Sequence, residues 1–67
     1  ERESTWFTGY NDKFFYDRGV LYHYLYGPAA RPMALRFLFA HREEMCREIP
    51  WRKAYGIMCR GIARAED

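Results

Sequence analysis

Apolar residues recur every three or four positions over much of this chain, a spacing that predicts helices rather than strands. The pattern is densest over residues 14–27 (FFYDRGVLYHYLYG), where seven of the fourteen side chains carry an aromatic ring, counting the imidazole. Asp17 and Arg18 fall together within this stretch and do not alternate with apolar residues, as a half-buried strand would require. Gly27 and Pro28 follow it and are expected to end the helix.

The same periodicity predicts three helices, at about residues 11–26, 32–48 and 51–64. Asn11 is a good capping residue for the first helix, and Pro50 separates the second from the third. Connections this short place sequential helices antiparallel to each other. We therefore predict an all-α fold, a small antiparallel three-helix module over residues 11–65, preceded by a polar lead-in at residues 1–10.

The core is expected to centre on the second helix, because Phe37, Phe39 and Ala40 widen its apolar face beyond a single stripe. Gly19 lies inside the first helix, where it would allow a close approach of another helix. The side chains expected to be among the most buried are Leu21, Leu25, Leu38, Met45, Trp51 and Met58.

Length and composition favour one small folded domain. The chain has 67 residues, of which 49% are hydrophobic and 19% aromatic, and this composition excludes a disordered chain. Cys46 and Cys59 are too few for a disulfide-built domain, so we predict two buried or half-buried thiols in a reducing compartment. The sequence begins at Glu1 with polar residues rather than a core element, which suggests a segment of a longer protein.

The charges are unevenly distributed along the chain. Residues 1–17 carry a net charge of −2, residues 18–65 carry +6, and nine of the eleven basic residues are arginine. Arginine suits phosphate and carboxylate partners, although solvated helix faces explain the same pattern. Tyrosines on the first helix also favour an interface with another molecule, or else serve as core. The candidate interaction surface comprises Tyr16, Arg18, Tyr22, Tyr26, Arg52, Lys53, Arg60 and Arg64.

Catalytic and metal-binding chemistry find little support in the residues. The potential zinc ligands are His23, His41, Cys46 and Cys59, and their spacings match no zinc motif. Glu43 and Glu44 are adjacent, so they point to different sides of a helix and cannot act as a carboxylate pair. We predict no catalytic, cofactor-binding or metal-binding residue in this chain.

Nucleic-acid binding is an alternative, because arginines interleaved with aromatic residues are its usual ingredients. A helix-turn-helix arrangement would use residues 51–64 as the recognition helix. That helix has no Asn, Gln, Ser or Thr to contact bases, and the net charge is only +2. These features argue against nucleic acid as the partner, and it stays part of the alternative reading only.

One resemblance extends over residues about 11–63. The residues that carry it are Phe15, Tyr16, Arg18, Leu21, Tyr22, Phe37, Leu38, Arg42 and the Gly61-Ile62 pair. This aromatic and arginine pattern resembles the C-terminal helical region of bacterial family-2 glycosyltransferases of the GT-A type, which build cell-surface polysaccharides. Many of those enzymes have Asn directly after the first-helix arginine, where this chain has Gly19.

The resemblance implies a non-catalytic module that packs on a glycosyltransferase catalytic domain. It would hold that enzyme in the cytoplasm, at the inner face of the membrane, near a lipid-linked acceptor or an anionic lipid surface. Nucleotide-sugar and divalent metal are expected only in the parent catalytic domain, since this chain has no Asp-x-Asp. A homodimer, formed through the tyrosines, is a further expectation. The alternative is a small helical protein-protein or nucleic-acid interaction domain without a link to sugars.

Overall fold

The computed structural model describes residues 9–45 and 47–67, and within these residues it contains helices and no strands, so the predicted all-α fold is confirmed. The elements are α1 (Asp12–Tyr26), the short 3-10 helix η2 (Gly27–Ala29), α2 (Ala30–Ala40), α3 (Arg42–Met45) and α4 (Trp51–Glu66). The predicted lead-in falls largely on residues 1–8, which lie outside the described residues, as does Cys46. Cys59 is a half-buried free thiol, as predicted.

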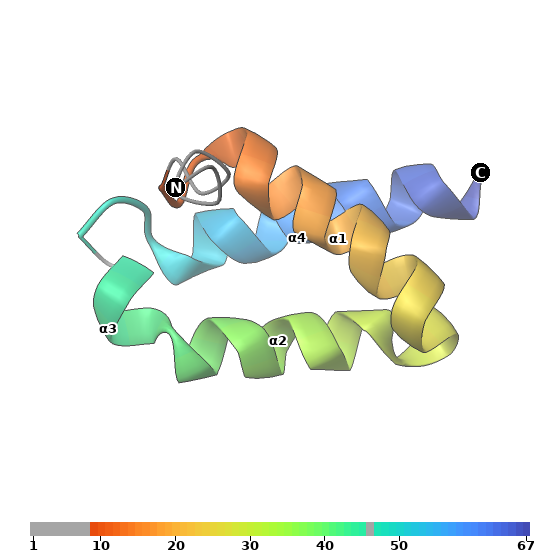
Figure 1. The fold of residues 1–67 in the computed structure, drawn as a ribbon, viewed down its shortest axis with the longest axis horizontal. Helices are drawn as coiled ribbons and strands as arrows, with labels where there is room; N and C mark the ends of the chain where they lie inside the picture. The colour runs from red at the N-terminus through yellow and green to blue at the C-terminus, as the bar shows by residue number, and fades with distance from the viewer. Residues whose placement is uncertain (1–8, 46) are drawn as a thin grey trace, which may run out of the picture.

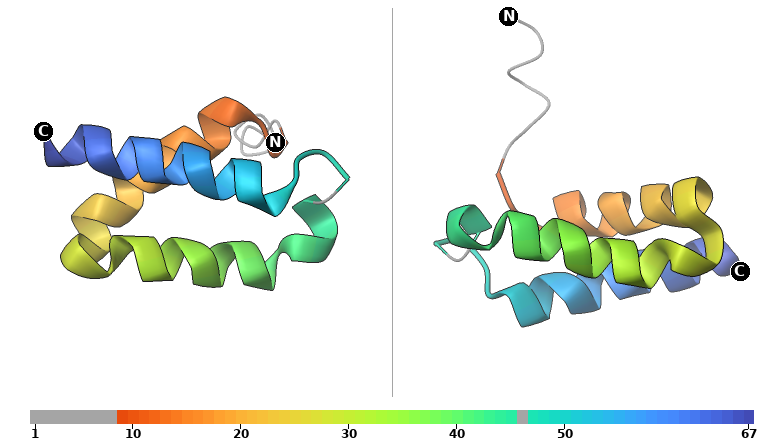
Figure 2. Two further views of the ribbon diagram at one scale, coloured as in Figure 1. Left: turned by 180° about the vertical axis from the view of Figure 1, so that it is seen from behind. Right: turned by 90° about the horizontal axis from the view of Figure 1, so that it is seen from below.

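The three long helices pack side by side (Figure 1). α2 runs antiparallel to both α1 and α4, whereas α1 crosses α4 while running in roughly the same direction. Seen from below in Figure 2, α2 lies in front, with α1 and α4 on either side of it. An ion pair between Arg31 at the start of α2 and Glu66 at the end of α4 (3.4 Å) fits this antiparallel pairing.

The first helix has the ends that its sequence predicts. The side chain of Asn11 accepts a hydrogen bond from the backbone N–H of Phe14 (2.8 Å), which satisfies one of the free donors of the first turn. Gly27 has a positive φ of 58° and donates its N–H to the carbonyl oxygen of His23. Glycine adopts this backbone conformation without the steric cost that other residues incur.

The second predicted helix is interrupted, so the expectation of one helix over residues 32–48 was wrong. α2 starts at Ala30 and ends at Ala40, and α3 continues in a new direction after His41. The imidazole Nδ1 of His41 lies 2.9 Å from the carbonyl oxygen of Phe37, the same oxygen that accepts the backbone N–H of His41. His41 itself leaves the helical conformation (φ −111°, ψ 14°), and its N–H is shared between the carbonyl oxygens of Phe37 and Leu38, as is common at a helix end.

Among the described helices, α1 and α4 make the closest contact, so the prediction that the second helix is central was wrong. At the crossing, a Cβ atom built on Gly19 would overlap the backbone carbonyl of Met58, and one built on Gly61 would overlap that of Tyr16. Both glycines are buried within their helices. The predicted role of Gly19 in a close helix approach is therefore confirmed.

The core draws side chains from α1, α2, α3 and α4. Its largest fully buried side chains are Phe15, Leu38, Met45, Met58 and Ile62. Leu38, Met45 and Met58 were predicted to be buried, and this is confirmed, but the prediction was wrong for Leu21, Leu25 and Trp51, which are all exposed.

The error in α1 has a geometric cause. Gly19 turns the face that it shares with Phe15 toward α4. Leu21 and Leu25 lie well away from that face at 3.6 residues per turn, so they point to solvent.

Candidate functional site: an apolar groove between α2 and α4

An open groove of about 770 Å3 lies between α2 and the start of α4. Its lining residues are Leu35, Arg36, Leu38, Phe39, Ala40, Arg42 and Trp51. Leu38 belongs to the closed core, whereas Leu35 and Phe39 lie one turn apart on the neighbouring face of α2. Pro50 has an extended backbone and starts α4 at Trp51, which brings this indole to the same groove.

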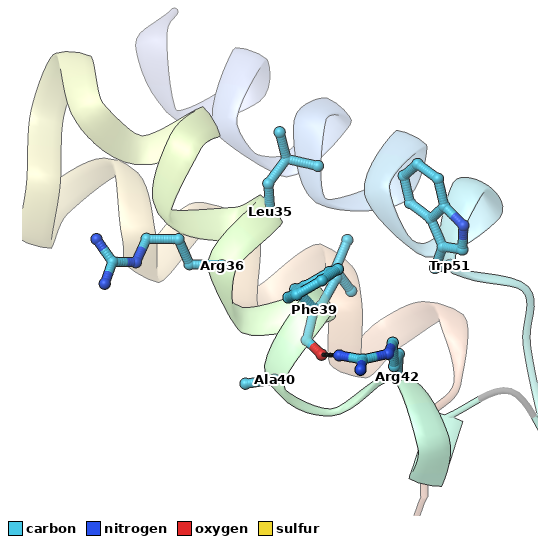
Figure 3. A pocket seen from close by; sticks show the side chains of 7 residues that line it. Leu35, Arg36, Phe39, Ala40, Arg42 and Trp51 are labelled. Carbon is cyan, nitrogen blue, oxygen red and sulfur yellow. Dashed lines mark hydrogen bonds between the residues drawn. The ribbon is translucent and has the colours of Figure 1, made fainter.

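Large apolar side chains are exposed in this groove, and they are not part of the buried core. The exposed fractions are 42% for Leu35, 69% for Phe39 and 48% for Trp51. Figure 3 shows that Leu35 and Phe39 come from α2 and Trp51 from the start of α4, so the two helices both contribute to the groove. Single exposed apolar residues are common on protein surfaces, but a group of them lining one hollow is typical of a binding site.

Arginines lie against both exposed rings. The guanidinium carbon of Arg42 lies 4.3 Å from the centroid of the Phe39 ring, and Arg42 also donates a hydrogen bond to the Phe39 carbonyl oxygen (2.7 Å; Figure 3). The guanidinium carbon of Arg52 lies 5.8 Å from the Trp51 ring. Each contact is a cation–π interaction, and together they place positive charge at the edge of an apolar surface.

The predicted surface residues of α1 lie on a different side of the molecule. The guanidinium carbon of Arg18 lies 4.8 Å from the Phe14 ring and 5.1 Å from the Phe37 ring, so Arg18 covers the contact between α1 and α2. Tyr22 packs edge-to-face on Tyr26 and on Phe37. The structure therefore places Arg18 and Tyr22, both half-buried, against Phe37, whereas Tyr26 is exposed and packs on Tyr22.

The predicted basic residues of α4 are all exposed, but they divide between two sides of the helix. Lys53, Arg60 and Arg64 follow one another at seven and four residues and therefore share one side. Trp51 lies roughly 160° round the helix from Lys53 at 3.6 residues per turn, and its neighbour Arg52 contacts it.

Arg60 lies next to α1. With Tyr16 and Asp17, it lines a shallow hollow between α1 and α4. Tyr16 is half-buried there, and its carbonyl oxygen faces Gly61 at the crossing. The name basic edge is used below for Lys53, Arg60 and Arg64.

The sequence did not identify several groove residues as part of an interaction surface, among them Leu35, Arg36, Phe39 and Arg42. One signal in the sequence was the excess of apolar residues on this helix, more than a single buried stripe needs. That excess indicated a central helix, whereas part of it lines a surface groove.

The pKa values of two tyrosines, Tyr10 and Tyr55, are raised. Partial burial and a hydrogen bond from its hydroxyl to Glu44 (2.7 Å) raise the pKa of Tyr10 above its ordinary value. The backbone N–H of Tyr10 also donates to Glu48 (2.8 Å). A hydrogen bond with Cys59, together with partial burial, raises the pKa of Tyr55.

Neither a membrane-spanning helix nor a metal-binding cluster occurs in the part of the chain that the structure describes. No helix there has the length and apolar character needed to cross a bilayer. The His, Cys, Asp and Glu side chains of the same residues form no group of three or more that could hold a metal ion. Comparison with protein-family models, curated proteins and solved structures found no match.

Proposed function

We propose that this chain is a non-catalytic helical module that docks onto another protein through the groove between α2 and α4. The observation that carries the proposal is the gathering of Leu35, Phe39 and Trp51, all substantially exposed, beside a core that closes without them. Aromatic residues and arginine are the types enriched where protein interfaces bury most of their binding energy. Phe39 with Arg42 and Trp51 with Arg52 supply that combination twice.

We propose further that the larger protein is a family-2 glycosyltransferase. The support is the resemblance of residues about 11–63 to the C-terminal helical region of those enzymes. On this proposal the nucleotide-sugar and its metal belong to the catalytic domain, and the module packs against that domain.

A second surface favours a membrane role for the same module. Lys53, Arg60 and Arg64 are exposed along the basic edge of α4, away from the groove. A row of basic side chains is attracted to anionic lipid, at about 1 kcal/mol for each residue near the surface. We propose that this edge holds the enzyme at the inner face of the membrane, next to its lipid-linked acceptor.

Site-specific photocrosslinking in the cells that make the protein tests the docking function. A photoreactive phenylalanine analogue replaces Phe39 or Trp51, and the same analogue at Ala63, which is exposed on α4, serves as the control. We expect both groove positions to crosslink to one polypeptide or domain, and the control not to do so. Crosslinks from the groove to nucleic acid or lipid, or to no partner, would contradict the docking function.

The identity of the crosslinked polypeptide tests the finer proposal. A GT-A domain carrying an Asp-x-Asp motif, in the same chain or in a separate one, is the expected result. A reproducible partner without such a domain would leave the docking function standing and contradict the link to glycosyl transfer.

A further inference from the structure

The charge around the groove shows which kind of segment would bind there. The charged side chains among its described lining residues, Arg36 and Arg42, are both positive. Arg52 adds a third positive charge beside Trp51. In Figure 3, Arg36 and Arg42 lie on the α2–α3 side of the groove, and Arg36 points away from the apolar centre.

Two carboxylates of the same region, those of Glu44 and Glu48, are turned to another side of the molecule. Glu44 accepts a hydrogen bond from the hydroxyl of Tyr10, and Glu48 accepts one from its backbone N–H. Both carboxylates therefore face the start of α1. Arg42 instead donates to a backbone carbonyl oxygen, a neutral acceptor that leaves its positive charge at the groove.

The shape of the groove suits a helix. It lies between two antiparallel helices, its lining is aliphatic as well as aromatic, and it is open to solvent. An amphipathic helix bound in such a groove inserts apolar residues spaced three or four apart. Nucleic-acid bases would instead need free aromatic faces for stacking, and Arg42 lies over the Phe39 ring.

We infer that the occupant of the groove is an amphipathic helix of the partner protein, with an apolar stripe flanked by Asp and Glu residues. This inference rests on the proposed docking function and names the chemistry of its partner. The apolar stripe would contact Leu35, Phe39 and Trp51, and the flanking carboxylates would pair with Arg36, Arg42 and Arg52. Opposite charges at the edge of an interface mainly set orientation and partner choice, so the acidic flanks determine specificity.

Selection from a display library of short helical peptides with randomised surface positions tests the inference on the full chain. We expect enriched peptides to carry apolar residues at helical spacing, with Asp and Glu beside them. Phe39→Ala should weaken the best peptide by roughly tenfold or more, as loss of a central aromatic contact does.

A charge-reversed variant gives the sharper result. Arg36→Glu with Arg42→Glu should switch the selected flanks to Lys and Arg. Lys53→Glu with Arg64→Glu changes the net charge equally on the opposite side of α4 and should leave the acidic preference intact. All four residues are exposed, and unfolding curves verify that both variants fold.

Several results would overturn the inference. The library could show no enrichment, or it could enrich peptides with neutral or basic flanks. Both charge variants could lose the acidic preference equally, or a second copy of the chain could occupy the groove. Oligonucleotide binding that displaces the selected peptides would overturn it as well. Crosslinks from Phe39 and Trp51 to one polypeptide, combined with neutral or basic flanks in the library, would refute the acidic helix while leaving the docking function in place.

Discussion

Two glycines determine how closely the helices of this molecule pack. Gly19 of α1 faces the backbone of Met58, and Gly61 of α4 faces the backbone of Tyr16. In each case the obstacle to a side chain is a carbonyl group of the facing helix rather than a flexible side-chain end. A third glycine, Gly56, has open space where its Cβ atom would lie.

Alanine at these positions should have opposite effects on stability. Gly56→Ala should stabilise the protein by about 0.5–1 kcal/mol, because alanine favours the helix and nothing opposes its methyl group. Gly19→Ala gains the same propensity but forces α1 and α4 apart, so we expect a net loss of about 1–3 kcal/mol. Urea unfolding measures both free energies, and the same sign for the two variants would contradict the crossing geometry.

Tyr10 should make the free energy of unfolding depend on alkaline pH. Its pKa lies above 10.0 in the folded protein, because burial and the hydrogen bond to Glu44 favour the neutral phenol. A folded-state pKa that is raised gives stability that is complete below pH 10 and is lost as the pH rises through the folded pKa. The ionised phenolate would also be repelled by Glu44 and Glu48.

Tyr10→Phe isolates this effect, since it keeps the ring and leaves Tyr55 to titrate in both proteins. At neutral pH the variant should lose about 1 kcal/mol, the contribution of one hydrogen bond. Above pH 10 the difference between the two proteins should shrink. Parallel losses of stability with pH in both proteins would show that the hydroxyl of Tyr10 is not responsible.

At the scale of single elements, α2 combines a core face and a binding face on adjacent residues. Leu38 is buried against the core, and Phe39, the next residue, points into the groove. The two functions can therefore be separated by substitution within one helical turn.

Leu38→Ala should cost about 2–5 kcal/mol of unfolding free energy, because it leaves a cavity in the core. Phe39→Ala should change the same free energy by no more than about 1 kcal/mol, the value of an exposed ring with one cation–π contact. Denaturant unfolding of the two variants makes the comparison. A loss of several kcal/mol in Phe39→Ala would make this ring part of the core and remove the main support for the groove.

The same elements show how far the sequence determines the structure. The ends of α1 and the start of α4 followed from local chemistry: Asn11 as a cap, Gly27 as a stop and Pro50 before Trp51. These features act over a few residues, so the sequence is sufficient to predict them. The break at His41 has no such signal, because neither a glycine nor a proline stands at the end of α2.

Which face of a helix is buried depended on partners that the sequence does not specify. Gly19 was expected to allow close packing, but only the crossing with α4 shows that this turns Leu21 and Leu25 outward. The groove was missed for the same reason. Leu35 and Phe39 are apolar, as core residues are. They lie at the surface because Trp51 is the one residue of α4 that lines the groove beside them.

On the scale of the whole molecule, α4 separates two surfaces of different chemistry. Trp51 lines the apolar groove beside α2, and the basic edge of Lys53, Arg60 and Arg64 follows the side next to α1. A protein bound in the groove would therefore leave the basic edge accessible. On the proposed function, this arrangement would let one small module contact a catalytic domain and an anionic surface together.

Vesicle binding tests the second of these surfaces. We expect the chain to bind phosphatidylglycerol vesicles better than phosphatidylcholine vesicles, with a preference that falls as salt is added, because exposed charges are screened over roughly 8–10 Å near physiological ionic strength. Replacing Lys53, Arg60 and Arg64 by Gln should weaken this binding on the order of a hundredfold, from about 1 kcal/mol per residue. The matched control replaces Arg36, Arg42 and Arg47 by Gln, which removes the same charge from exposed positions away from the basic edge. If the two triple variants lose affinity equally, net charge explains the binding and the basic edge has no special role; if neither loses affinity, the membrane proposal fails.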